Sequence, residues 1–189
     1  MGKRRQLNRD RVIEKAVELV DGSGDARSLS LTTLAQALEI RPPSLYNHVT
    51  SLEDLQYGMA LFGVQQLMAN LRQASLDLIG RDALVAVAMA YRQFAHRHPG
   101  IYPLTIRAPE SGETELANLA QELMQMLQLM MASMGLQGED AIHAIRGLRA
   151  ILHGFVSLEA ADGYKMALEL GESFQRLVYT YLEGLLLID

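Results

Sequence analysis

The sequence predicts an all-α protein, and three observations support that fold class. Only 5 of the 189 residues are proline, and glycine falls mostly between segments whose apolar residues recur every three or four positions. No stretch alternates apolar and polar residues for long, as a half-buried strand does. Apolar residues make up 49% of the chain, which is enough for a sizeable core.

The first predicted helix begins after Asn8, whose side chain can cap the helix N-terminus. It ends in the stretch 21–24, because Gly24 can take the left-handed C-cap conformation at little cost. Its apolar stripe is made of Val12, Ile13, Ala16, Val17, Leu19 and Val20.

A helix-turn-helix is predicted next. Ser30 caps a short helix that reaches Leu38, residues 39–41 form a turn, and Pro42 opens a second short helix through residue 49, since a first helical turn tolerates proline. Thr50 or Ser51 caps the following helix, which runs to about residue 78. The residues expected to pack the pair onto the first helix are Leu34, Leu38, Ile40, Leu45 and Val49.

Later helices are predicted at 81–98, 101–107, 112–134, 139–161 and 168–187, with glycine and proline between them. The sequence therefore predicts a three-helix helix-turn-helix domain in residues 1–50 and a larger helical bundle in residues 51–189.

Charge is distributed unevenly between these two parts. The net charge of the chain is −5, but residues 1–50 carry a net +2 and residues 51–189 a net −7. The basic residues are densest at Lys3, Arg4, Arg5, Arg9 and Arg11. A cationic end on an acidic body is typical of a DNA-binding protein with a separate second domain, although a solvated tail gives the same pattern.

Several other classes of protein find little support. The chain has no cysteine and no apolar run near the roughly 20 residues that span a bilayer, so we expect a cytoplasmic protein that does not enter a membrane. The 5 histidines include no pair at positions i and i+4, which argues against a metal site. No cofactor motif and no set of nucleophile, base and orienting residue is present, so we do not expect an enzyme.

The helix-turn-helix leaves a polar surface once its apolar residues face inward. This outward set is rich in hydrogen-bond donors and includes an aromatic ring, as in surfaces that enter the major groove of DNA. A helical hairpin that only packs is the alternative. The outward residues are Arg41, Pro42, Ser44, Tyr46, Asn47 and His48.

Residues 7–62 closely resemble the N-terminal DNA-binding domain of the TetR family of bacterial repressors. The resemblance is carried by residues 11–20, Gly24, the leucines and alanine of 31–38, the string Pro43-Ser44-Leu45-Tyr46-x-His48-Val49, and Leu55. It implies that the third helix reads DNA, with base-edge or phosphate contacts from Arg41, Pro42, Pro43, Ser44, Tyr46 and His48. Ser30 and Thr32 open the second helix, whose amides would face a phosphate, although Ser30 can equally serve as a cap alone and His48 as a packed helix-end residue.

Two residues depart from the family pattern. The family usually has glycine at the position of Glu39, where the second helix ends in the left-handed conformation, so Glu39 should cost about 1 kcal/mol there. The family also often has a phosphate-binding lysine at the position of Leu52. We expect the basic residues Lys3, Arg4 and Arg5 to offset that loss at the minor groove or the backbone of DNA.

The second domain resembles the regulatory-domain subgroup that carries a Trp-His-Gly signature, in residues 91–102 and in Leu152-His153-Gly154-Phe155, where leucine replaces the tryptophan. Its helix 116–134 is apolar on most sides and rich in methionine, which adapts to varied partners. We expect a pocket for a small apolar effector, with an ordinary methionine-rich core as the alternative. The predicted lining residues are Met59, Phe62, Met89, Phe94, Tyr102, Leu123, Met124, Leu127, Met130 and Met131.

The last two helices are amphipathic, and in the resembled family they form a four-helix interface between two subunits. The predicted interface residues are Ile145, Leu148, Leu152, Phe155, Phe174, Leu177, Val178 and Tyr181, with intramolecular core as the alternative. The sequence thus predicts a homodimeric regulator that binds a near-palindromic duplex and is released by its effector. A helical-bundle enzyme and a protein-binding adaptor are the alternatives.

Overall fold

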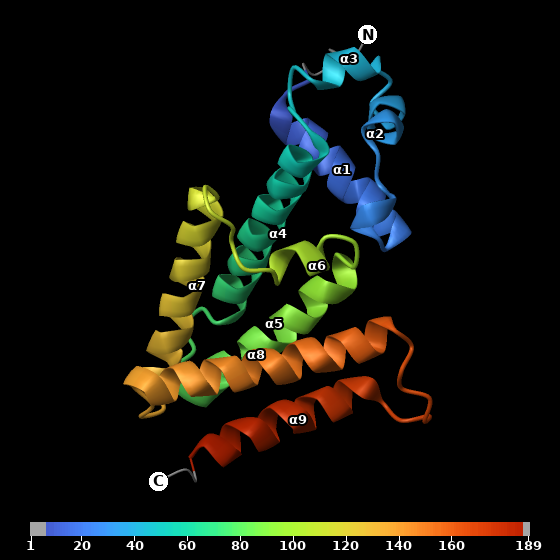
Figure 1. Ribbon diagram of the computed structural model, residues 1–189. Coiled ribbons are helices and arrows are strands. Elements are labelled where there is room, and N and C mark those ends of the chain that lie inside the picture. Colours follow the sequence, from blue (N-terminus) through green and yellow to red (C-terminus); the bar gives the residue numbers. More distant parts are fainter. Residues whose placement is uncertain (1–6, 187–189) are drawn as a thin grey trace. The chain divides into compact units, whose positions relative to one another are not determined.

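A computed structural model of the chain describes residues 7–186, which form helices and connecting turns throughout (Figure 1). The chain divides into two compact units. Unit 1 contains the residues up to Gln65 together with Arg97–Leu116, and unit 2 contains Gln66–His96 and the residues from Ala117 onward. These compact units are not the same thing as functional domains, so the functional boundary predicted at residue 50 stays a prediction.

Unit 1 begins with α1 (Arg9–Ser23), which has the predicted caps at both ends. The Asn8 side chain accepts a hydrogen bond from the Arg11 N–H, and the N–H of Gly24, at φ 73°, donates to the Val20 carbonyl. The buried face of α1 consists of Val12, Ile13, Ala16, Val17 and Val20. The predicted stripe is therefore the core face, except that Leu19 is only half-buried.

The helix-turn-helix consists of α2 (Leu31–Ala37) and α3 (Pro42–Leu45), which follow a short 3₁₀ helix, η1 (Ala26–Ser28), that the sequence did not predict. Leu34 and Leu45 are fully buried, whereas Leu38 and Ile40 are half-buried. The small Ala35 is also fully buried, which lets the two short helices pack closely.

The prediction that the second helix of this pair runs to Val49 was wrong, because α3 ends at Leu45. The amides of His48 and Val49 both bond to the Leu45 carbonyl, which makes a turn rather than further helix. Val49 is fully buried below this turn. The next helix, α4 (Leu52–Ala74), starts at a Ser51 cap and ends four residues short of its predicted limit.

A segment from the middle of the sequence completes unit 1. It contains the short α6 (Tyr102–Thr105) and the start of α7 (Thr114–Ala132). Asp21, near the end of α1, accepts hydrogen bonds from the amides of Gly100 at 3.0 Å and Ile101 at 3.1 Å, and its other oxygen lies 2.6 Å from His98 Nδ1. Residues 98–101 are thereby fixed to α1.

Unit 2 is built from the end of α4 (from Gln66), α5 (Gly80–Arg97, less its last residue), most of α7, α8 (Gly138–Ala160) and α9 (Leu170–Leu185). Helices α8 and α9 pack side by side. The Tyr181 hydroxyl of α9 donates to the Ala144 carbonyl of α8 at 2.7 Å. It lies where a Cβ on Gly147 would be, so α8 needs glycine there.

An ion pair next to two aromatic rings links α5 to α8. The Arg92 guanidinium donates two hydrogen bonds to Glu159, at 2.9 and 2.5 Å, and lies over the rings of Phe155 and Phe174. Burial opposes ionisation of Glu159, but hydrogen bonds from Arg92 and His96 outweigh it and lower the Glu159 pKa.

Candidate nucleic-acid interface

The polar residues predicted to read DNA form one exposed stretch of unit 1, over α2, α3 and the turn that follows. Tyr46, the C-terminal cap residue of α3, has 56% of its surface exposed, although it is a large aromatic residue. His48 is half-buried. The predicted residues that are exposed are Ser30, Thr32, Arg41, Pro42, Pro43, Ser44, Tyr46 and Asn47, whereas Lys3, Arg4 and Arg5 lie outside the described residues.

The start of α2 is fixed by a local cap. The Ser30 side chain accepts a hydrogen bond from the Thr33 N–H at 3.1 Å, and the two hydroxyls lie 2.8 Å apart. Ser30 therefore acts as an N-cap. Its role toward a phosphate stays a prediction.

The end of α2 has the strained conformation expected for Glu39, whose φ is 55°. The Ile40 N–H bonds to the Ala35 carbonyl and the Glu39 N–H to the Gln36 carbonyl, which is the Schellman arrangement that usually places glycine where Glu39 stands. The turn into α3 thus keeps its geometry without glycine, at a cost in backbone strain.

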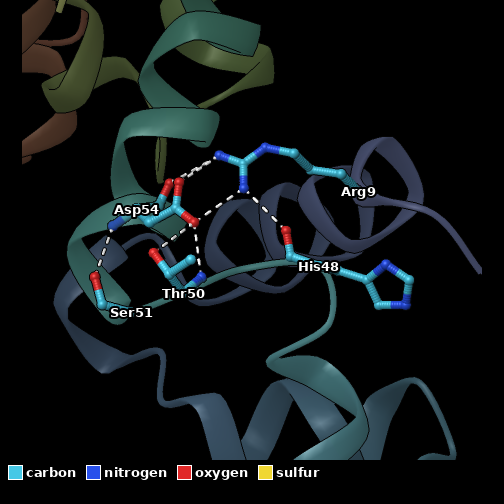
Figure 2. Close-up of polar contacts among 5 residues, drawn as sticks. All are labelled: Arg9, His48, Thr50, Ser51 and Asp54. Atoms are coloured by element: carbon cyan, nitrogen blue, oxygen red, sulfur yellow. Dashed lines mark hydrogen bonds and ion pairs between the residues drawn. The ribbon is translucent and has the colours of Figure 1, made fainter.

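The turn after α3 is held by a polar cluster around Arg9 and Asp54 (Figure 2). Arg9 Nη1 donates to the His48 carbonyl at 2.9 Å and to Asp54 Oδ2 at 3.0 Å, while Arg9 Nη2 donates to Asp54 Oδ1 at 2.5 Å. Asp54 Oδ2 also accepts hydrogen bonds from the Thr50 N–H at 2.7 Å and the Thr50 hydroxyl at 3.1 Å. We call Arg9, Asp54, Thr50 and the His48 carbonyl the α3–α4 clamp.

The clamp is strongly electrostatic. The hydrogen bond from Arg9 is the largest cause that lowers the pKa of Asp54 to about 2, and the same bond raises the pKa of Arg9. Asp54 is therefore ionised throughout the neutral range. The Asp54 N–H donates to Ser51 Oγ at 3.1 Å, and the Asp54 carboxylate accepts from the Thr50 N–H. These two hydrogen bonds together cap the start of α4.

The sequence indicated a cap at Thr50 or Ser51 but gave no indication that Arg9 pairs with Asp54. The spacing of Ser51 and Asp54 is a local signal of a cap. Arg9 and Asp54 are 45 positions apart, and their pairing carries no local signal.

Comparison with known proteins decides the family. The family model "Tetracyclin repressor-like, C-terminal domain" matches residues 84–181. A Bacillus subtilis (strain 168) protein named as the uncharacterized HTH-type transcriptional regulator YobS is 30% identical over 99% of this chain and 97% of its own length. This chain belongs to the TetR family of transcriptional regulators.

Two further similarities agree with this. The uncharacterized HTH-type transcriptional regulator Rv0681 of Mycobacterium tuberculosis is 35% identical over 82% of this chain and 71% of its own length. The crystal structure of a TetR variant from Acinetobacter baumannii AYE, in complex with minocycline, superposes with a TM-score of 0.67 at 19% identity, covering 95% of this chain and 96% of that one. As a member of this family, the chain is a DNA-binding transcriptional regulator and not an enzyme. The Trp-His-Gly subgroup stays a prediction.

The residues predicted to bind an effector are distributed over both units of this TetR-family chain. Met59, Phe62 and Tyr102 belong to unit 1, and the other seven to unit 2. Among the ten, Met59, Phe94, Tyr102 and Met131 are buried, Met124 is exposed, and the remaining five are half-buried. Their role in binding stays a prediction.

Most residues predicted for the dimer interface are buried within the single chain. Because α8 and α9 pack against each other, at most 7% of the surface of each of these residues is exposed. For Ile145, Leu148, Leu152, Phe155, Phe174 and Val178, a role in a dimer interface stays a prediction, with intramolecular core as the alternative. Leu177 and Tyr181 are half-buried and stay predictions.

No helix of residues 7–186 is both long and apolar enough to cross a bilayer. The same residues contain no group of three histidine, aspartate or glutamate side chains arranged to hold a metal ion.

Proposed function

We propose that this chain is a repressor that binds near-palindromic duplex DNA as a homodimer, through the surface that runs from Arg41 to His48, and that a small apolar effector releases it. The observation that carries the proposal is the exposure of Tyr46 and its polar neighbours on a turn that the α3–α4 clamp fixes.

The exposed residues fit the two kinds of contact that DNA readers make. Arg41 and Asn47 have the donors that bind base edges, and Pro43 with the Tyr46 ring offers apolar surface to a thymine methyl group. The Tyr46 hydroxyl and His48 suit phosphate oxygens, which set the register of the protein on the duplex. Thr32 and the amides at the start of α2 extend this phosphate contact, and Lys3, Arg4 and Arg5 add to it in the proposal.

Membership of the family and exposed apolar residues near the end of α8 support a homodimer. Leu158 is 50% exposed, and Met166 and Leu168, in the α8–α9 connection, are 80% and 69% exposed. A second copy would cover such residues together with Leu177 and Tyr181. Two-fold symmetry would place two reading surfaces about 34–36 Å apart, one turn of DNA, which calls for a near-palindromic site.

The effector half of the proposal is supported by α7. Of its nine leucine and methionine side chains, only Leu116 and Met131 are buried, so much apolar surface is available to a ligand. Binding there would release DNA if the effector favours a conformation of the protein that fits DNA poorly.

Selection of bound sequences from a pool of random duplexes tests the DNA half. We expect a near-palindromic sequence, and we expect Tyr46→Ala to weaken its binding about tenfold or more and Tyr46→Phe about threefold, because only the latter keeps the ring. Leu76→Ala, which truncates a 63% exposed residue of unit 2, is the control and should bind as the wild type does. Recovery of no sequence preference would refute the proposal.

Release is tested by titrating small apolar aromatic compounds, and separately the more polar minocycline, into the complex with the selected duplex. A true effector binds the free protein more tightly than the DNA complex by the same factor by which it weakens DNA binding. If no compound that binds the protein changes its affinity for DNA, the effector mechanism fails and the DNA-binding proposal stands.

A further inference from the structure

The α3–α4 clamp has a consequence for how DNA is read. We propose that Arg9 is a positioning residue for DNA recognition: by bridging the His48 carbonyl and Asp54 it fixes the orientation of Tyr46 and His48, and it does so without contacting DNA itself. The proposal rests on the proposed function of the Arg41–His48 surface.

The turn between α3 and α4 is held at two successive points. The His48 carbonyl accepts from Arg9, and the Thr50 N–H and hydroxyl both donate to Asp54. Between these points lies Val49, which is fully buried. The backbone on both sides of Val49 is therefore fixed, while the ring of His48 points away from the clamp (Figure 2).

This restraint is needed because α3 has only four residues. A single helical turn is not stable alone, since nucleating a helix costs more than one turn of hydrogen bonds returns. The C-terminal cap of α3 is Tyr46 itself, so the direction of the Tyr46 side chain depends on where the following turn is held.

The two guanidinium nitrogens that Arg9 would offer to a phosphate are already engaged. Both Nη1 and Nη2 donate to Asp54, and Nη1 also donates to the His48 carbonyl. The approach of α1 to α4 is close enough for this because Gly58, one turn beyond Asp54, has no side chain where Ile13 lies. A Cβ at Gly58 would also lie 3.5 Å from Arg9 Nη2.

The test compares Arg9→Met, Arg9→Lys and Asp54→Asn with a control, Lys15→Met, which removes a positive charge from the same helix outside the clamp. Dissociation constants are measured over a series of salt concentrations for the selected duplex and for a scrambled duplex of equal length. The temperature is one at which circular dichroism shows each variant to be folded.

For a positioning residue we expect all three clamp variants to bind the selected duplex about tenfold more weakly than the control, comparable to the loss of one base contact. Binding to the scrambled duplex and the dependence of affinity on salt should match the control, since no phosphate contact is lost. Arg9→Lys should behave like Arg9→Met, because lysine keeps the charge but lacks the planar fork that spans two acceptors.

Two results would overturn the proposal. If the slope of log K against log salt falls by about one unit with both duplexes relative to the control, Arg9 is a phosphate ligand. If the clamp variants bind the selected duplex as the control does, the clamp is structural only. Should Arg9→Met not fold, Arg9→Lys and Asp54→Asn decide between these outcomes.

Failure of the underlying function has a different signature. If the wild type itself does not prefer the selected duplex over the scrambled one, the proposed function fails and the Arg9 proposal fails with it. If the wild type discriminates and the clamp variants discriminate equally well, only the Arg9 proposal fails.

Discussion

The turn after α3 and the helix α7 show two opposite ways in which this chain places a segment. The first has few residues and is held by directed bonds, with Arg9 and Asp54 fixing the backbone at His48 and Thr50. The second, α7, has nineteen residues and abundant apolar surface, and part of that surface is not packed: Leu129 is 74% exposed and Met124 is 37% exposed.

The difference fits the roles proposed for the two segments. Double-stranded DNA presents donors and acceptors at fixed positions, so side chains that read it need a backbone held by short, charge-assisted hydrogen bonds. Methionine side chains are flexible and polarizable, so a face rich in them adapts to ligands of different shape. Rigid packing in unit 1 and loose burial along α7 are therefore the two properties to test.

The largest expected effect tests how rigidly unit 1 is packed. A Cβ on Gly100 would overlap the Val20 carbonyl and lie 2.6 Å from the Asp21 nitrogen, both of which are backbone atoms of α1. Gly100→Ala should therefore destabilise the protein by about 3 kcal/mol, measured by urea unfolding. Gly22→Ala, where nothing lies within 4 Å, is the matched control and should be neutral or stabilising. A tolerated Gly100→Ala would show that α1 and residues 98–101 move apart easily.

Acid should weaken the clamp next. Asp54 has its pKa lowered from 3.8 to about 2 by Arg9, so its ionised form stabilises the folded state fully above pH 4, and this contribution disappears as the pH falls toward 2. The loss is at most about 2 kcal/mol. Unfolding free energies measured between pH 5 and 2 should fall less steeply for Asp54→Asn than for the wild type. Parallel curves would contradict a clamp based on charge.

A smaller effect of opposite sign is expected at Glu39. Its φ of 55° is unfavourable for a residue with a Cβ, so Glu39→Gly should stabilise the protein by about 1 kcal/mol in thermal unfolding. Asp162, with φ 52°, is the matched control in unit 2. Asp162→Gly should give a similar gain, and a loss at Glu39 alone would indicate a contact that the backbone angle does not reveal.

The smallest effect is expected on the exposed side of α7. Leu129→Ala should change the free energy of unfolding by less than about 0.5 kcal/mol, because 74% of Leu129 is already exposed. Met131→Ala, two residues away and fully buried, should cost about 2–5 kcal/mol. If both substitutions cost the same, Leu129 must be buried in solution, and the contrast between an exposed α7 and the clamped turn would not hold.

Much of the fold was predictable because the signals are local. Asn8 and Ser30 cap helices through bonds to residues three positions on, Gly24 ends α1, and Glu39 takes the left-handed conformation anticipated for it. The exposure of Arg41, Pro42, Ser44, Tyr46 and Asn47 was likewise predicted, since burying the apolar members of a short amphipathic helix leaves the polar members outside. His48, predicted to face outward, is half-buried, and the role of this surface in binding DNA stays a prediction.

Other features were not predictable because several arrangements satisfy the same pattern. The amphipathic stripes of α8 and α9 suit a dimer interface or a core equally well, and Leu148 and Phe174 are buried within the single chain. The length of α3 was overestimated because its apolar periodicity continues to Val49, while the chain there forms a turn.

The sequence by itself determined the helices, their caps and the polar surface of the helix-turn-helix, because each depends on residues within a few positions of one another. Only the tertiary structure decided that Arg9 pairs with Asp54 and that Asp21 holds the Gly100 amide 79 positions away. Many other charged or polar groups along the chain could form hydrogen bonds with Arg9 or Asp21 equally well. The packing of α1 against α4 and residues 98–101 selects one partner for each.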